Sequence, residues 1–125
     1  MNLVDSSGWL EFFANGPNAH FFGEPLKSAD IPLLVPTICL YEVFKQILRR
    51  YGRREAMEKA TAMRQGIVVP LHDELAINAA VISHDKKLPM ADSVILATAQ
   101  HYAATLWTQD ADFENIDGVR YIKKP

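Results

Sequence analysis

Residues 32–70 read PLLVPTICLYEVFKQILRRYGRREAMEKATAMRQGIVVP, with an apolar run near each end and two helix-like segments between them. Residues 32–36, apolar between two prolines, predict a buried strand. A helix is expected from residue 37 to about 51, because a threonine stands at its start and a glycine follows its end. A second helix is expected over about 53–65, and residues 67–70 predict a second strand. This part of the chain therefore alternates strand and helix.

The same alternation continues on both sides. Residues 3–4 predict a short strand that ends at Asp5, and Ser6 and Ser7 are expected to cap the helix that follows it. Further helices are expected at about 20–26, 73–83 and 91–102, and further strands at 106–108 and 119–122. The pattern predicts an α/β fold, a three-layer α/β/α sandwich with a mostly parallel central sheet of four or five strands. A chain of 125 residues fits a single domain, 1–125.

The amino-acid composition indicates an ordered, globular protein. Hydrophobic residues make up 49% and charged residues 22% of the chain, as in an ordered globule. The N-terminus has no basic segment followed by a long apolar run, so we expect neither a signal peptide nor a membrane span. We therefore expect a cytoplasmic protein. The single cysteine, Cys39, cannot form an internal disulfide and is expected to fill space in a helix.

Charge is informative through its distribution. A net charge of -2 argues against a protein that binds a nucleic-acid duplex by positive charge alone. Basic residues are nevertheless concentrated at positions 45–54. Lys45 and Arg49 share a predicted helix face with Glu42 and are expected to contact the substrate, although such a face is more often simply solvated. The other basic residues of this group are Arg50, Arg53 and Arg54.

Four acids from distant parts of the chain are candidates for one site. Asp5 and Asp110 follow predicted strands, and ligands of parallel sheets gather beyond the carboxyl ends of strands, near the point where the strand order reverses. Asp92 falls on the apparent inward face of its helix, and Glu42 lies opposite an apolar stripe. The inward face with Asp92 also contains Ile95, Leu96, Ala99 and Ala103. The stripe opposite Glu42 contains Leu40, Val43, Phe44, Ile47, Leu48 and Tyr51.

Each acid also has a purely structural explanation. Asp5 could form a turn or begin a helix, and Glu42 could pair with Lys45 at the surface. Asp92 could accept backbone N–H groups in the first turn of its helix, and Asp110 could belong to a polar turn. The four together favour a common site, because chance does not readily bring four such residues to one edge of a sheet.

Four segments resemble the PIN-domain family, and specifically the VapC-like ribonuclease toxins of toxin–antitoxin pairs. The similar segments are Leu3–Ser7, Pro36–Val43, Met90–Ala99 and Thr108–Phe113. Each segment is short and made of common residues, but their order and spacing cover nearly the whole chain. Position 109 differs from the family pattern: it holds a glutamine, where a basic or small polar residue would be expected.

The resemblance implies a role for each candidate residue. Asp5, Glu42, Asp92 and Asp110 would be catalytic, with Asp5, Asp92 and Asp110 as metal ligands and Glu42 binding metal or orienting the attacking water. The resemblance also implies hydroxyl support from Ser6 and Thr108, and an indirect role for Asp112, behind the ligands or through water.

A divalent cation suits such a group of acids. Crowded carboxylates raise one another's pKa, and a cation removes that conflict. Oxygen ligands without His or Cys favour Mg²⁺ or Mn²⁺ over zinc. The expected reaction is hydrolysis of RNA by a metal-activated water, with no protein nucleophile. By resemblance, the expected partners are an RNA substrate, a cognate antitoxin and a second copy of the chain in a homodimer, with no membrane.

Two alternatives belong to other functional classes. A phospho-accepting receiver domain has a similar length and gathers acids around Mg²⁺, and Lys124-Pro125 is similar to its closing motif. It would require adjacent acids after the first strand and a lone aspartate after the third, which this sequence lacks. The second alternative is a non-catalytic PIN-like module that binds RNA or protein, which usually requires loss of the metal-binding acids.

Overall fold

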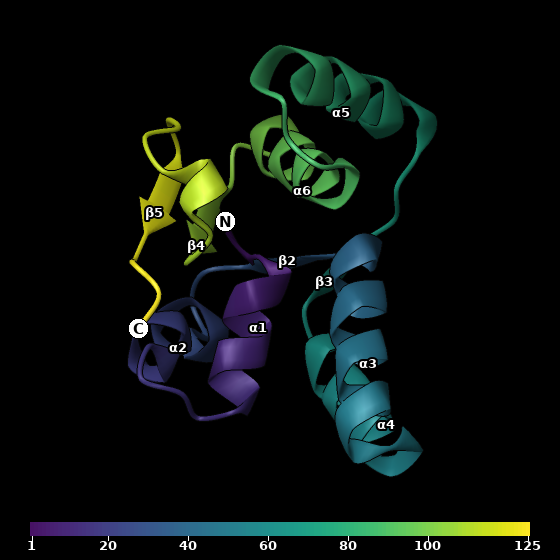
Figure 1. Ribbon diagram of the computed structural model, residues 1–125, viewed down its shortest axis with the longest axis vertical. Helices are drawn as coiled ribbons and strands as arrows, with labels where there is room; N and C mark the ends of the chain where they lie inside the picture. Colours follow the sequence, from purple (N-terminus) through teal and green to yellow (C-terminus); the bar gives the residue numbers. More distant parts are fainter.

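Five short strands form a parallel sheet at the centre of the structure, a computed structural model that describes residues 1–125 (Figure 1). The strands stand in the order β3-β2-β1-β4-β5, and every neighbouring pair is parallel. The prediction of a mostly parallel sheet of four or five strands is therefore confirmed. The strands are β1 (Asn2–Val4), β2 (Leu33–Pro36), β3 (Ile67–Val69), β4 (Thr105–Thr108) and β5 (Val119–Tyr121).

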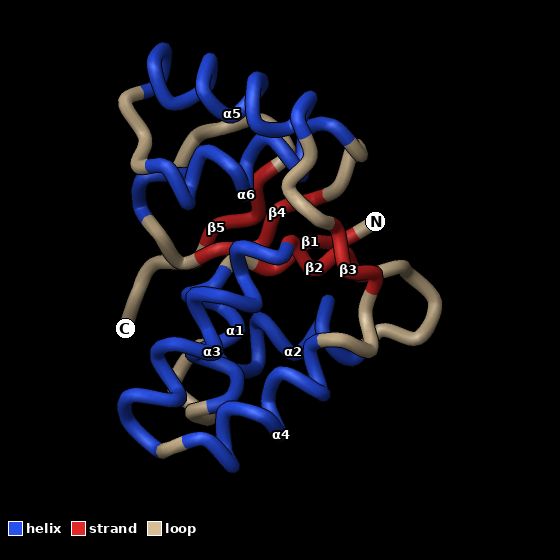
Figure 2. The backbone as a smooth tube through the Cα atoms, turned by 90° about the vertical axis from the view of Figure 1, so that its right-hand side faces the viewer, coloured by secondary structure: helices blue, strands red, loops and turns tan.

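Helices cover both faces of this sheet (Figure 2). Two of them, α5 (Asp73–Lys86) and α6 (Met90–His101), lie on one side. The other side holds α1 (Ser6–Phe13), α2 (Ala19–Lys27), α3 (Thr37–Tyr51) and α4 (Arg53–Met63), and a short 3₁₀ helix, η1 (Ala111–Phe113), follows β4. The predicted three-layer α/β/α sandwich is confirmed. None of the helices combines the length and the apolar composition needed to cross a bilayer.

The strand order decides against a receiver domain. In a receiver-type sheet the order is 2-1-3-4-5, so the third strand pairs with the first. Here β3 lies at an edge of the sheet and β4 pairs with β1. The receiver interpretation is therefore wrong.

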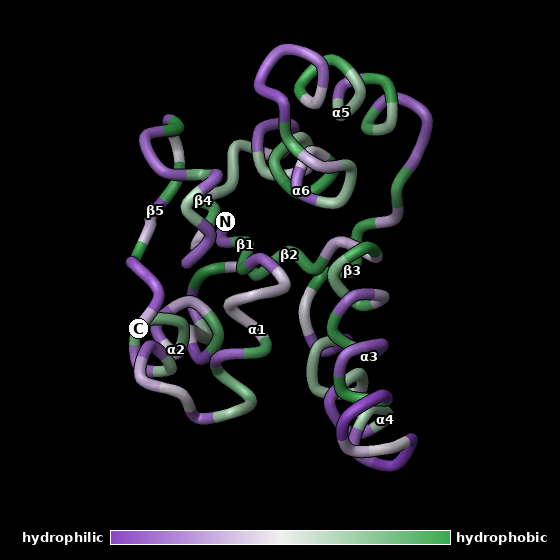
Figure 3. The backbone as a smooth tube through the Cα atoms, in the orientation of Figure 1, coloured by the Kyte–Doolittle hydropathy of each residue, from purple (hydrophilic) through white to green (hydrophobic).

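The central strands form the core because helices pack on both of their faces. Leu3, Val4, Val35 and Leu106 are fully buried or nearly so. Consecutive apolar residues are typical of a parallel strand that is covered on both sides, and Figure 3 shows β1 and β2 as hydrophobic. Cys39 is also buried, which confirms its predicted packing role, and this burial raises the pKa of its thiol and keeps the thiol neutral.

The far part of α3 departs from the predicted apolar stripe. Cys39, Val43 and Ile47 are buried, as a core-facing side requires. Leu48 and Tyr51, which the helical projection placed in the stripe, are 38% and 61% exposed. The physical reason is that α3 runs past the sheet, where α4 is its main neighbour and leaves these side chains uncovered.

Two helix ends also differ from the prediction. The helix expected to end at Ser83 continues to Lys86, and Lys87 stops it by taking a left-handed conformation with φ of 59°. The helix expected to reach residue 102 ends at His101. Ala103, predicted on its inward face, instead lies exposed in a turn with φ of 52°.

Candidate active site

The strand order reverses between β1 and β4, and the candidate acids collect there. β2 and β3 extend the sheet from one side of β1, while β4 and β5 extend it from the other. Asp5 follows β1 directly, Asp110 follows β4 after one intervening residue, and the backbone N–H of Asp5 donates to the carbonyl of Trp107. Because β1 and β4 are parallel neighbours, their carboxyl ends bring the two acids to one place.

Asp5 is buried and held by three hydrogen-bond donors. Its carboxylate accepts the Thr108 hydroxyl at 2.6 Å, the backbone N–H of Gly8 at 2.9 Å and the Ser7 hydroxyl at 2.9 Å. Burial, the largest effect, raises the pKa of Asp5 to about 6 against the lowering effect of these hydrogen bonds. Asp5 itself is thus the N-cap of α1, a position that the sequence had assigned to Ser6 and Ser7. A carboxylate reaches the free N–H groups of the first turn, so helix cap and site residue coincide.

Thr108 connects Asp5 to Asp110. The Thr108 hydroxyl is fully buried; it donates to Asp5 and accepts the backbone N–H of Asp110 at 2.9 Å. One oxygen of Asp110 in turn accepts the backbone N–H of Asp112 at 3.0 Å and caps η1. The predicted contact between Thr108 and the acids is therefore present, and the polar turn suggested for Asp110 is present as well.

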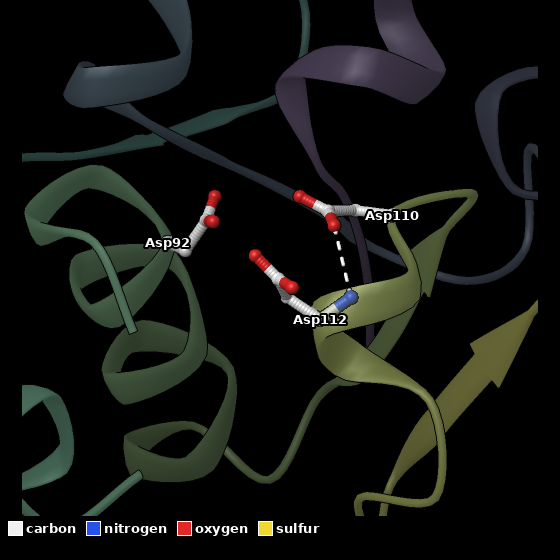
Figure 4. A group of neighbouring side chains, drawn as sticks. All are labelled: Asp92, Asp110 and Asp112. Carbon is white, nitrogen blue, oxygen red and sulfur yellow. Dashed lines mark hydrogen bonds between the residues drawn. The ribbon is translucent and has the colours of Figure 1, made fainter. Parts of the chain in front are cut away.

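Three aspartates bring their carboxylates together beside this network. One oxygen from each of Asp92, Asp110 and Asp112 lies within 4.8 Å of the others, and Figure 4 shows the side chains turned toward a common space. Asp92 comes from the first turn of α6, whereas Asp110 and Asp112 flank the start of η1. Asp112 thus lies in the cluster with Asp92 and Asp110, whereas Asp5, the third metal ligand predicted from the sequence, is not part of it.

Asp92 carries the strongest electrostatic perturbation of the three. Its carboxylate accepts no backbone N–H, so the structural explanation suggested for it is not observed, and Pro89 occupies the N-cap. Burial, followed by the negative charges of nearby acids, raises the pKa of Asp92 to about 7. Those acids are, in decreasing order of effect, Asp110, Asp5, Glu42 and Asp112.

Glu42 lies on α3, which covers the other face of the sheet from α6, the helix that carries Asp92. Its Oε1 accepts the Ser6 hydroxyl at 2.7 Å, which ties α3 to the first residue of α1 and places Ser6 where a supporting hydroxyl was expected. The surface pair of Glu42 with Lys45 does not form, because the Lys45 ammonium lies over the Tyr41 ring at 5.6 Å. Glu42 thus remains without a cationic partner.

No basic side chain neutralises these acids. The two ion pairs of the structure join Lys59 to Glu55 and His84 to Asp85. Lys45 and Arg49 are exposed and contact none of the acids; Arg49 donates to Gln46 at 2.7 Å. Close carboxylates that lack a counter-ion, with oxygen as the only ligand atom, suit a hard divalent cation.

Sequence reasoning missed one residue that supports the site. Asn18, in the turn before α2, donates to the side chain of Gln109 at 2.9 Å and to the backbone carbonyl of Lys123 at 3.0 Å. This fixes the residue between Thr108 and Asp110, and it joins the α1–α2 turn to the C-terminal segment. No signal in the sequence relates positions 18 and 109, because the contact depends on the packing of α2 beside β4.

The chain matches one protein-family model and resembles several solved structures. The family model described as "PIN domain" matches residues 3–119. A toxin–antitoxin complex from Klebsiella pneumoniae has a similar fold, with a TM-score of 0.79, 22% identity, and 96% of each chain covered. VapC20 of Mycobacterium tuberculosis, described as a sarcin–ricin-loop-cleaving toxin, gives a TM-score of 0.72 and 21% identity, over 90% of this chain and 92% of that one.

VapBC2 from Rickettsia felis, solved with a DNA fragment of its promoter, gives a TM-score of 0.76 at 12% identity, over 98% of this chain and 97% of that one. No curated protein matches by sequence. These structural likenesses concern the fold, whereas the family match covers nearly the whole sequence and includes all the acids described above. The chain belongs to the PIN-domain family.

Proposed function

We propose that this protein is a divalent-metal-dependent endoribonuclease that hydrolyses phosphodiester bonds of RNA. The observation that carries the proposal is the cluster of Asp92, Asp110 and Asp112, whose carboxylates meet within 4.8 Å without a basic partner. Membership of the PIN-domain family supports the nuclease activity, and the structurally similar VapC20 is described as a sarcin–ricin-loop-cleaving toxin.

The acids divide the work of binding and proton transfer. Asp92 and Asp110 would hold Mg²⁺ or Mn²⁺ together with Asp112, whose carboxylate lies in the same cluster. Asp5, whose charge raises the pKa of Asp92, would be a further ligand from the end of β1. When bound, the ion would supply a Lewis acid for the scissile phosphate and lower the pKa of a water. Glu42 has its Oε1 fixed by Ser6, which leaves Oε2 to orient that water and accept its proton.

The hydrogen bonds around Asp5 hold the site in position. Thr108 and Ser7 donate to its carboxylate, so the side chain cannot rotate away when the surrounding charge changes. The bond from Thr108 also fixes the backbone of Asp110, and both acids therefore keep their separation. Such preorganisation lowers the cost of collecting like charges at the moment of reaction. The resemblance to PIN nucleases further suggests products with 5′-phosphate and 3′-hydroxyl ends.

We further propose that the protein is the toxin of a toxin–antitoxin pair, works in the cytoplasm and forms a homodimer. The similar structures from Klebsiella pneumoniae and Rickettsia felis, described as a toxin–antitoxin complex and as VapBC2, support an antitoxin partner. Exposed apolar side chains support a further protein interface on the α5 side of the sheet: Ile77 is 65%, Val81 55% and Met90 74% exposed. Apolar patches of this kind are typical of association surfaces.

Cleavage of a labelled, structured RNA tests the activity. The purified protein should cut it with Mg²⁺ or Mn²⁺ and not with chelator, and Asp92→Asn should lower the rate by about a hundredfold or more. Asp117→Asn is a matched control, because Asp117 is an exposed aspartate outside the site. Equal cleavage by wild type and Asp92→Asn would indicate a contaminating nuclease. RNA binding without any cleavage would favour the non-catalytic PIN-like module instead.

A further inference from the structure

Charge is strongly segregated between the far part of the α3–α4 hairpin, residues 45–64, and the rest of the molecule. The segment from Lys45 to Arg64 contains seven basic and two acidic residues, a net charge of +5. The rest of the chain contains six basic and thirteen acidic residues, a net charge of -7. The overall charge of -2 hides this separation. A protein that is basic in the far part of a projecting hairpin and acidic in the remainder can attract a polyanion through the hairpin alone.

The basic charge is densest at the end of the hairpin, where α3 turns into α4. We call this end, residues 49–54, the hairpin tip; Gly52 makes its turn with φ of 92°, and four arginines surround it. All four are exposed and none forms an ion pair, although the Arg50 guanidinium lies over the Tyr51 ring at 5.5 Å. In Figure 1 the tip is the part of the hairpin farthest from the sheet. Like charges gathered in this way repel one another, so the tip is suited to an anionic partner.

A cleft leads from the tip toward the acids of the site, although none of these acids lines it. It has a volume of about 670 Å³ and lies between α1 and the α3–α4 hairpin. One end is lined by Ser7, which donates to Asp5, and by Gln109, the residue before Asp110. The other end is lined by Arg50 and Tyr51 of the tip. The cleft therefore extends from the most basic part of the surface to residues beside the candidate active site, and its lining also includes Lys59, Glu11 and Glu55.

We propose that the cleft and the hairpin tip form a second RNA-contact surface, which binds the backbone of a single-stranded segment on one side of the scissile phosphate. The proposal rests on the ribonuclease function proposed above. Arg50 lies eight residues beyond Glu42 on α3, about 12 Å away along the helix axis, so the tip reaches phosphates distant from the one that is cut. Guanidinium groups bind phosphates in a bidentate way, and the exposed ring of Tyr51 offers a surface for base stacking.

The double variant Arg53→Gln/Arg54→Gln tests this proposal. Lys86→Gln/Lys87→Gln is the matched control, because it removes the same charge at the end of α5, on the other side of the sheet (Figure 2). RNA affinity is measured by fluorescence anisotropy over a series of salt concentrations, in an Asp92→Asn background with chelator, so that no cleavage occurs. The probes are unstructured RNAs of about 20 and of about 2 nucleotides, the shorter of which has a single internucleotide phosphate and therefore cannot occupy the acids and the tip at once.

The tip variant is expected to bind the longer RNA about tenfold more weakly, and the slope of log K against log salt should fall by about 1.4 for two lost phosphate contacts on a single strand. The control pair should keep the parent slope, and the shorter RNA should lose far less affinity. In the cleaving enzyme, the tip variant should raise KM for the longer RNA with little change in kcat.

Equal salt slopes for the tip variant and the parent would overturn the inference while leaving the nuclease function intact. An equal loss in the control pair would also overturn it, because net charge alone would then explain the binding. If the parent binds no RNA, both the inference and the proposed function fail. Melting temperatures of all variants confirm that each one is folded.

Discussion

Replacement of Asp92 by asparagine is expected to stabilise the metal-free protein. Burial and neighbouring negative charge raise the pKa of Asp92 from 3.8 to about 7, so ionisation of this carboxylate costs free energy in the folded state. At about 1.4 kcal/mol per pKa unit the difference corresponds to roughly 4 kcal/mol, which we halve because the side chain is only partly buried and solvent screens it. The uncharged variant should therefore gain about 2 kcal/mol in the free energy of unfolding at neutral to alkaline pH.

The gain depends on pH in a direction set by proton linkage. Between pH 3.8 and about 7 the folded protein retains the Asp92 proton that the unfolded chain releases. The free energy of unfolding of the wild type therefore falls as the pH rises through this range, and it has lost the whole contribution above about pH 7. Asp92→Asn lacks this part of the fall. Its advantage should be largest near pH 8 and should shrink steadily as the pH is lowered toward 4.

Thermal unfolding followed by circular dichroism in the presence of chelator measures the effect. A gain of about 2 kcal/mol corresponds to a rise of roughly 8 °C in melting temperature for a chain of this length. Added Mg²⁺ should raise the melting temperature of the wild type and leave the variant nearly unchanged, because the ion binds the folded state through the acid that the variant lacks. Asp117→Asn should behave as the wild type throughout. A variant that melts at or below the wild type in chelator near pH 8 would refute the assignment of Asp92 as an uncompensated charge.

Three further substitutions test the supports of the site. Thr108→Val should lower the free energy of unfolding by about 1–3 kcal/mol in urea denaturation, because it removes the donor to Asp5. Thr108→Ser keeps the hydroxyl and should lose less stability. Equal losses in the two variants would contradict the role of the hydrogen bond. Ser6→Ala should lower kcat about tenfold with little change in melting temperature, because it removes the hydrogen bond that orients the Glu42 carboxylate. An unchanged kcat would show that this hydrogen bond does not orient Glu42. Gly8→Ala should cost about 1–3 kcal/mol, because its Cβ would lie 2.6 Å from packed side chains, and wild-type stability would disprove the close packing of α1.

Much of the fold could be predicted because its determinants are local. The strand around Leu34 is apolar without interruption, Leu106 and Trp107 form a shorter apolar pair, and glycines follow several of the helices, so element types and order follow from neighbouring residues alone. The exposure of Leu48 and Tyr51 could not be predicted in this way. It depends on how far α3 extends beyond the sheet, and strand lengths in distant segments determine that.

The candidate site shows the same division. Asp5 and Asp110 were found because both follow strands, and the topology of a parallel sheet then brings them together. The place of Asp112 within the cluster could not be predicted, because it depends on the turn that Asp110 caps at η1. The N-cap was assigned one residue too late for a similar reason. An acid that ends a strand can also start the next helix, and the sequence alone does not rank it above Ser6.

The bond between Thr108 and Asp5 joins residues 103 positions apart, and β4 occupies a place beside the first strand, in the middle of the sheet. During synthesis, the ribosome therefore releases this central strand only after β2 and β3, on the far side of β1, and all six α-helices have already emerged. Until that moment the sheet has a gap at its centre, and Asp110 has not reached Asp5. A nascent chain that has not yet produced β4 would thus lack the assembled site, and fragments that stop short of β4 would lack Asp110 and Asp112 altogether.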